Sequence, residues 1–169
     1  MELKILVATT KPLKGQWYEL PSKELIQKAE EWEIEGKESL VLETSASFDK
    51  KVLKELKTEH FTVREWNQLA EKLSCVPDEI LQNPDIFTMY EPLEEILEDE
   101  GQKFFSFELD TMTEVAEFLV QEELISSYMT DEELIEHYLD YEKLGRDLHN
   151  ERTFFDGPYG KVQYISWKG

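Results

Sequence analysis

The chain has 169 residues, of which 40% are hydrophobic and 12% aromatic, and this composition excludes an intrinsically disordered protein. The single cysteine, Cys75, excludes an internal disulfide and suits a reducing compartment. No apolar run reaches the roughly 20 residues that span a bilayer, and the first residues lack the basic and apolar regions of a signal peptide. We therefore expect a folded cytoplasmic protein.

The net charge of −20 is concentrated in one part of the chain. Residues 73–142 hold 21 carboxylates and a single basic side chain, Lys103, whereas the other 99 residues hold 17 acidic and 17 basic side chains. So uneven a distribution is typical of a surface that binds a cationic partner. The alternative is that the acidic block only keeps the protein soluble.

The positions of the acids argue against solubility as their only role. Three pairs of acids fall four residues apart on a helix that begins near Pro92, and each like-charge pair costs about 0.2–0.5 kcal/mol. The pairs are Glu91/Glu95, Glu94/Glu98 and Glu95/Asp99. Acids at the C-terminal end of this helix each cost about 0.3–1 kcal/mol more, because they face the negative end of the helix dipole. The sum reaches a few kcal/mol, against a typical folding stability of about 5–15 kcal/mol.

Residues 1–60 predict a small antiparallel sheet with one helix on its face. Residues 2–9, 15–20 and 39–44 are rich in β-formers. Between the second and third of these strands, Ser22 is a plausible N-cap of a helix that ends near Gly36. The run 49–58 is ambiguous between helix and loop.

Residues 61–102 predict a helical module. Thr62 and Glu65 form a capping box, which begins a helix that runs to about Ser74. The buried stripe of this helix is expected to consist of Trp66, Leu69, Ala70 and Leu73. Three prolines, Pro77, Pro84 and Pro92, each begin a further short helix, and the last of these helices is the acidic one.

Residues 103–169 predict a second small sheet with helices. Residues 103–109 alternate like a strand, and capping boxes at Thr111 and Thr130 begin two helices. The second helix is expected to end at Gly145. A hairpin around the turn 156–160 closes the chain. The fold class is therefore α+β, with three units, 1–60, 61–102 and 103–169, docked in a row along an elongated body.

Signals for catalysis or metal binding are weak. The three histidines are far apart, and only Glu133/His137 falls at a spacing that presents two metal ligands on one helical face. No glycine-rich phosphate loop and no EF-hand loop is present in the sequence, and Cys75 has no histidine near it. We expect no metal, no cofactor and no enzymatic activity.

The C-terminal third carries a more specific signal. The segment 138–148, with the sequence Tyr-Leu-Asp-Tyr-Glu-Lys-Leu-Gly-Arg-Asp-Leu, precedes Thr153-Phe and the hairpin with Gly160, and it resembles the C-terminal signature of the ArdA antirestriction family. The segments 15–17, 61–69 and 93–96 resemble other family segments in the same order. The signature residues are Tyr138, Tyr141, Leu144, Gly145, Arg146, Asp147 and Leu148.

The resemblance implies a function that fits the charge distribution. Members of this family are elongated three-domain homodimers from mobile genetic elements, and they imitate bent B-form DNA in the DNA-binding groove of type I restriction–modification enzymes. It also implies a dimer contact within residues 138–165. Because B-DNA carries one charge per roughly 1.7 Å of its axis, 20 net charges correspond to about 34 Å of duplex per chain.

We therefore expect a non-catalytic DNA mimic that occupies the methyltransferase core of such an enzyme and binds neither nucleic acid nor membrane. The alternative is an acidic adaptor for another basic DNA-associated protein. The residues expected to form the acidic surface are Glu91, Glu94, Glu95, Glu98, Asp99, Glu100, Asp110, Glu114, Glu117, Glu122, Glu123, Asp131, Glu132, Glu136 and Asp140.

Overall fold

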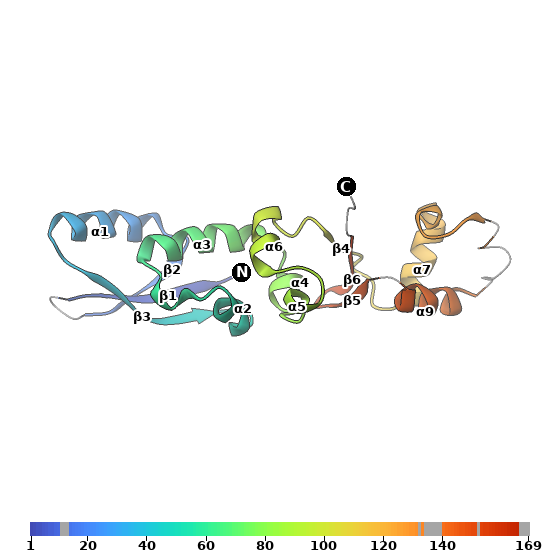
Figure 1. Ribbon diagram of the computed structural model, residues 1–169, viewed down its shortest axis with the longest axis horizontal. Helices are drawn as coiled ribbons and strands as arrows, with labels where there is room; N and C mark the ends of the chain where they lie inside the picture. The colour runs from blue at the N-terminus through green and yellow to red at the C-terminus, as the bar shows by residue number, and fades with distance from the viewer. Residues whose placement is uncertain (11–13, 132, 134–139, 152, 166–169) are drawn as a thin grey trace. The chain divides into compact units, whose positions relative to one another are not determined.

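The computed structural model describes residues 1–10, 14–131, 133, 140–151 and 153–165. The chain forms two compact units, Met1–Gly101 and Gln102–Gly169, and each is described by itself (Figure 1). Each unit holds helices and a small antiparallel sheet, so the α+β fold class is confirmed. The division into three domains remains a prediction. None of the helices in the described ranges is long and apolar enough to cross a membrane.

The first unit combines a three-stranded sheet with a series of helices. In chain order its elements are β1 (Leu3–Thr9), β2 (Gln16–Leu20), α1 (Lys23–Ile34), β3 (Ser39–Ala46), α2 (Lys50–Glu55), η1 (Thr58–His60), α3 (Val63–Cys75), α4 (Asp78–Leu81), α5 (Ile86–Met89) and α6 (Leu93–Asp99). The three predicted strands and the helix after Ser22 are confirmed. The ambiguous run 49–58 contains α2, because the Asp49 carboxylate accepts the Lys51 N–H at 2.8 Å and caps the helix.

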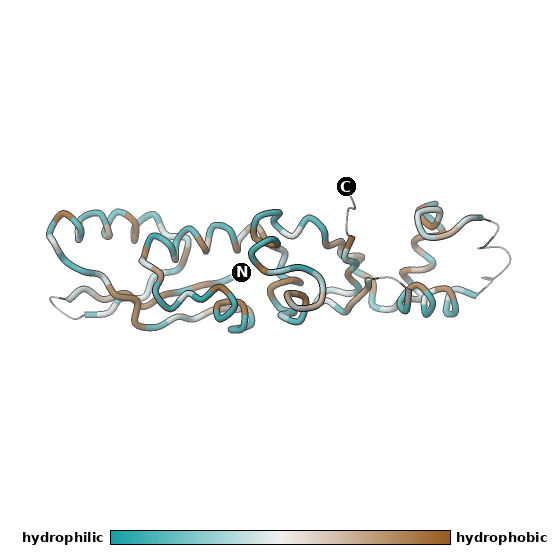
Figure 2. Tube along the Cα trace, in the orientation of Figure 1, coloured by the Kyte–Doolittle hydropathy of each residue, from teal (hydrophilic) through white to brown (hydrophobic). Residues whose placement is uncertain are grey.

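The sheet of the first unit is antiparallel, with the strand order β2-β1-β3. Leu3, Ile5 and Val7 alternate along the central strand β1 and are at most 1% exposed. Helices α1 and α3 lie along one face of this sheet (Figure 1). Figure 2 shows hydrophilic and hydrophobic residues alternating along both helices, as expected for helices with one buried face.

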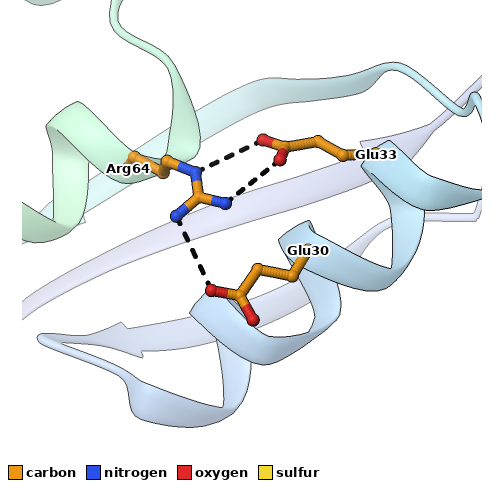
Figure 3. Close-up of polar contacts among 3 residues, drawn as sticks. All are labelled: Glu30, Glu33 and Arg64. Atoms are coloured by element: carbon orange, nitrogen blue, oxygen red, sulfur yellow. Dashed lines mark hydrogen bonds and ion pairs between the residues drawn. The ribbon is translucent and has the colours of Figure 1, made fainter.

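Hydrogen bonds to side chains fix the N-terminal end of α1. The Ser22 hydroxyl accepts the Leu25 N–H at 3.1 Å, which confirms the predicted N-cap. The buried Asn67 of α3 accepts the Ser22 N–H at 2.6 Å and so ties the two helices together. At the other end of α1, the Arg64 guanidinium donates to both carboxylate oxygens of Glu33, at 3.3 and 3.1 Å (Figure 3). Sequence patterns gave no hint of the Asn67 contact, since its partner lies 45 residues away.

The second unit has the elements β4 (Phe104–Ser106), α7 (Met112–Gln121), η2 (Ile125–Ser127), α9 (Tyr141–Glu151), β5 (Phe154–Gly157) and β6 (Gly160–Tyr164). Its sheet has the order β4-β6-β5, and β5 and β6 form the predicted hairpin. The predicted strand 103–109 is too long. It ends at Ser106, and Glu108 adopts a left-handed conformation, with φ +54°, which lies outside the extended region of regular strands.

Helices α7 and α9 pack against each other in the core of the second unit. Val115, Ala116 and Leu119 of α7 meet Leu144 and Leu148 of α9, and all five are at most 3% exposed. Leu148 thus packs inward. Residues 134–139 of the helix that is predicted to begin at Thr130 lie outside the described residues.

The prediction that Gly145 ends a helix is wrong. Gly145 lies in the middle of α9, at the point of closest approach to α7. A Cβ atom on this residue would lie 2.4 Å from the carbonyl oxygen of Met112. Glycine is needed here because it lets two helices approach closely, and its backbone freedom plays no part.

Candidate functional site

The acidic helix α6 presents two different faces. Leu93, Ile96 and Leu97 are at most 8% exposed and pack into the first unit. The opposite face carries Glu94, Glu95 and Glu98, all exposed. Because α6 begins only at Leu93, the like-charge pairs on this helix are Glu94/Glu98 and Glu95/Asp99. Their spacing places the paired Cβ atoms about 5–6 Å apart.

Glu91 does not belong to this exposed face. It precedes α6, its side chain is only 3% exposed, and its backbone N–H points to the Ile86 carbonyl oxygen at 3.5 Å. The predicted pair Glu91/Glu95 therefore does not form on a helix. The sequence prediction differs from the structure here because the helical spacing was extended to Glu91, which precedes the N-cap residue Pro92 and is buried.

The C-terminal end of α6 holds acids in an unfavourable position. The Asp99 carboxylate accepts the Gly101 N–H at 2.9 Å, and Glu100 is the C-cap, with a left-handed φ of +58°. A glycine relieves the steric cost of this conformation, whereas a glutamate side chain does not. The exposed carboxylate of Glu100 thus lies where both the helix dipole and the backbone conformation disfavour it.

Substitutions at Glu100 test whether the strained backbone at this helix end lowers the stability, independently of the lost charge. We expect Glu100→Gly to raise the free energy of unfolding by about 0.5–1 kcal/mol, because glycine adopts φ +58° without strain. The matched control is Glu95→Gly, which removes the same charge from the interior of the same helix and should lower that free energy by about 0.8–1 kcal/mol. Urea unfolding of the two variants measures the difference. Destabilisation by Glu100→Gly would contradict the structure of this helix end.

In the second unit, exposed acids follow one side of α7 and the loops at its ends. Asp110, Glu114, Glu117, Glu122 and Glu123 are exposed, as is Glu108, which the sequence analysis did not select. Glu108 and Glu123 both have left-handed backbones, with φ of +54° and +56°. Asp131 and Asp140 are exposed as well. Glu132 and Glu136 lie outside the described residues.

Several of these carboxylates also stabilise the local fold. The Thr111 N–H and hydroxyl both donate to the Glu114 carboxylate at 2.9 Å, and the Glu114 N–H donates to the Thr111 hydroxyl at 3.2 Å, so the predicted capping box is confirmed. Thr130 and Glu133 make the same set of contacts, at 2.8, 3.0 and 3.3 Å. Asp140 accepts the Glu142 N–H at 2.8 Å.

The Thr111 capping box makes stability depend on pH. The hydrogen bonds from the Thr111 hydroxyl and N–H lower the pKa of Glu114 below its ordinary value of 4.5. Because the folded-state pKa is lowered, this stabilisation is present above pH 4.5 and is lost as the pH falls through the lowered pKa. We expect Thr111→Ala to cost about 0.5–2 kcal/mol at neutral pH.

The measurement is urea unfolding at neutral pH and again well below pH 4.5. The difference between the wild type and Thr111→Ala should shrink at the lower pH, while Thr111→Ser, which keeps the hydroxyl, should behave like the wild type. A difference that grows on acidification would contradict the assigned capping box.

Acids within residues 73–142 and acids in the rest of the chain differ in how often they form ion pairs with basic side chains. Outside residues 73–142, several acids lie beside bases: Glu24 pairs with Lys28 at 2.8 Å, and Arg64 pairs with both Glu33 and Glu30 (Figure 3). In the part of the chain that the structure describes, no ion pair neutralises Glu94, Glu95, Glu98 or the exposed acids of α7. These exposed acids of α6 and α7 therefore give each unit a region of uncompensated negative potential.

The signature segment of the C-terminal third has mainly a packing role. Leu144, Gly145 and Leu148 are buried against α7, whereas Arg146 is exposed and pairs with Glu142 at 3.6 Å. Asp147 is half-buried and Tyr141 is 40% exposed. Tyr138 lies outside the described residues. Among the described residues, no group of three or more histidine, cysteine, aspartate or glutamate side chains is arranged to hold a metal ion.

A comparison with known protein families agrees with the resemblance seen in the signature segment 138–148. The profile of the family described as "Antirestriction protein (ArdA)" matches residues 11–163, which is nearly the whole chain. A search of curated proteins found no match. The family match covers strands β2 and β3 of the first unit, the acidic helix α6, and both α7 and α9. The chain therefore belongs to the ArdA family of antirestriction proteins.

Proposed function

We propose that this antirestriction protein is a DNA mimic that inhibits type I restriction–modification enzymes by occupying the DNA-binding groove of their methyltransferase core. The observation that carries the proposal is the set of exposed acids without basic partners in the described parts of α6 and α7. A protein groove that binds DNA is lined with lysine and arginine side chains, because phosphate contacts supply most of its affinity. An exposed row of carboxylates is the complement of such a groove.

The spacing of the carboxylates supports imitation of the DNA backbone. Acids three or four residues apart on a helix have Cβ atoms about 5–6 Å apart, so that successive turns of α6 and α7 present negative charges in rows. Rows of carboxylates carry no equivalent of a base edge. Inhibition should therefore be independent of the DNA sequence that the enzyme recognises.

This independence is the direct test of the proposal. Two type I enzymes with different recognition sequences are titrated with the protein, and both cleavage and methylation are followed. The account predicts inhibition of both enzymes at similar protein concentrations, with inhibition that weakens as salt rises. Inhibition of one enzyme and full activity of the other at large excess would contradict it.

We also propose that inhibition is stoichiometric and involves no catalysis, in the cytoplasm of a bacterial host. A titration of a fixed enzyme concentration should then reach its end point at a fixed molar ratio. An inhibitory enzyme would instead inactivate an excess of its target over time.

The proposed active form is a homodimer joined through residues 138–165 of the second unit. Two chains with a net charge of −20 repel each other, so a contact is favoured where the charge is lowest. The tail from residue 143 onward carries three acids and five bases. Sedimentation equilibrium at moderate salt tests this proposal, and a monomer at all concentrations would exclude it.

A further inference from the structure

The first unit contains a hollow between α3 and α6 that differs from the rest of the acidic surface. Its volume is about 360 Å³, and four apolar side chains form part of its wall. These are Leu56, Phe61, Leu69 and Leu97. Leu69 and Leu97 are buried, whereas Leu56 and Phe61 are half-buried and still present apolar surface to the hollow. A row of phosphates offers no such apolar wall.

The rim of the hollow is negatively charged. Glu94 and Glu98, four residues apart on α6, lie on one side, and Glu65 of α3 lies on the other. Lys72 is the one basic residue among those that line the hollow, so three carboxylates face one ammonium group. Glu95, on the same helix as Glu94 and Glu98, does not line the hollow.

Further contacts hold one residue of the rim, Glu65, and one residue of the apolar wall, Phe61, in place. The Glu65 carboxylate accepts the Thr62 N–H and hydroxyl at 2.7 and 2.9 Å, and these bonds lower its pKa, so the carboxylate is ionised at neutral pH. The Phe61 ring packs edge to face on the buried Trp66, with ring centroids 5.9 Å apart. The apolar wall and the charged rim are therefore preorganised.

We propose that this hollow receives one arginine side chain of the bound restriction enzyme, with its guanidinium between Glu94 and Glu98 and its aliphatic stem against Leu56 and Phe61. The origin of the arginine in a restriction enzyme rests on the proposed function. The binding of an arginine side chain by the hollow does not depend on the proposed function. Arginine fits better than lysine because its planar guanidinium bonds to two carboxylate oxygens at once and stacks on aromatic rings. Its stem covers apolar surface while its charge stays at the rim.

The binding test uses the full-length, isotope-labelled protein and does not need a restriction enzyme. The blocked peptide Gly-Arg-Gly is titrated while the backbone amide signals are followed, and the same peptide with uncharged citrulline in place of arginine is the control. We expect saturable shifts confined to residues around the hollow with arginine and none with citrulline. Equal shifts with both peptides, or shifts spread evenly over all acidic segments, would overturn the proposal.

Matched variants assign the site to named residues. The double variant Glu94→Gln/Glu98→Gln should abolish the saturable shifts, whereas Glu95→Gln/Glu100→Gln, which removes the same charge outside the hollow, should leave them intact. Lys72→Gln should tighten peptide binding at least about twofold, because it removes the competing cation from the rim. Equal loss in the two double variants would overturn the proposal.

The same variants separate this proposal from the proposed function. Against a type I enzyme, Glu94→Gln/Glu98→Gln should weaken inhibition more than Glu95→Gln/Glu100→Gln does. Peptide binding without any inhibition of type I enzymes would overturn the proposed function and leave the arginine site standing. Inhibition by the wild type without saturable peptide binding would overturn the arginine site alone.

Discussion

Replacing Glu94, Glu95, Glu98, Asp99 and Glu100 together with their amides is expected to weaken inhibition of a type I enzyme about 100-fold and to stabilise the protein at the same time. Ion pairs at the surface contribute about 0.2–1 kcal/mol each, so the loss of the four exposed glutamates and the half-buried Asp99 amounts to roughly 3 kcal/mol, and 1.4 kcal/mol corresponds to a tenfold change in affinity. Removal of two like-charge pairs on α6 stabilises the helix by about 0.4–1 kcal/mol. Relief of the unfavourable dipole interaction at its C-terminal end adds to this stabilisation.

The expected fall in inhibition together with a rise in stability makes this experiment informative, because a variant that merely unfolds loses both inhibition and stability. Inhibition is measured by titration against a fixed enzyme concentration, and stability by urea unfolding. The control removes five exposed acids from the neutral part of the chain, none of which forms an ion pair among the described residues: Glu31, Glu38, Glu43, Glu55 and Glu59. Equal loss of inhibition in both variants would show that only net charge matters and would contradict a localised acidic surface.

The second large effect is expected at Gly145. Helix propensity alone predicts that Gly→Ala within a helix stabilises it by about 1 kcal/mol. In α9, however, the new Cβ would lie 2.4 Å from the Met112 carbonyl oxygen and 2.8 Å from the Thr113 nitrogen, and backbone atoms cannot move aside cheaply. We therefore expect Gly145→Ala to destabilise the protein by about 1–3 kcal/mol, as overpacking does in other cores.

The sign of the change in unfolding free energy caused by Gly145→Ala decides between two roles for this glycine: close packing of α9 on α7, or the end of a helix. The control is Asn150→Ala, an exposed position on the same helix, where alanine should be neutral or slightly stabilising. Urea unfolding followed by circular dichroism measures both variants. Stabilisation by Gly145→Ala would contradict the close packing of α7 and α9 and would favour a role for the glycine at a helix end.

Local signals in the sequence predicted most of the helices and strands. The capping boxes at Thr62 and Thr111 depend on residues three apart, and both were read correctly for this reason. The buried stripe of α3, with Trp66, Leu69 and Leu73, follows from the helical period alone. The wrong prediction at Gly145 has a non-local cause, because its need for glycine comes from Met112, on another helix.

The candidate site was only partly accessible to sequence reasoning. The charge block was visible in composition, and exposure of Glu94, Glu95 and Glu98 followed from the buried face of α6. Burial of Glu91 depends on how the chain packs before Pro92, and no periodic pattern reports this. The hollow between α3 and α6 brings together residues 56–98, and its apolar wall is a property of the packed unit.

The central claim is that this protein competes with DNA for the same groove. The most direct measurement is a titration of the purified protein into a complex of a labelled DNA duplex with a type I methyltransferase core, at fixed salt. The account predicts displacement of the DNA at near-stoichiometric protein, independent of the recognition sequence in the duplex. A complex that retains its DNA at large excess would contradict mimicry, and the acidic surface would then belong to an adaptor for another basic protein.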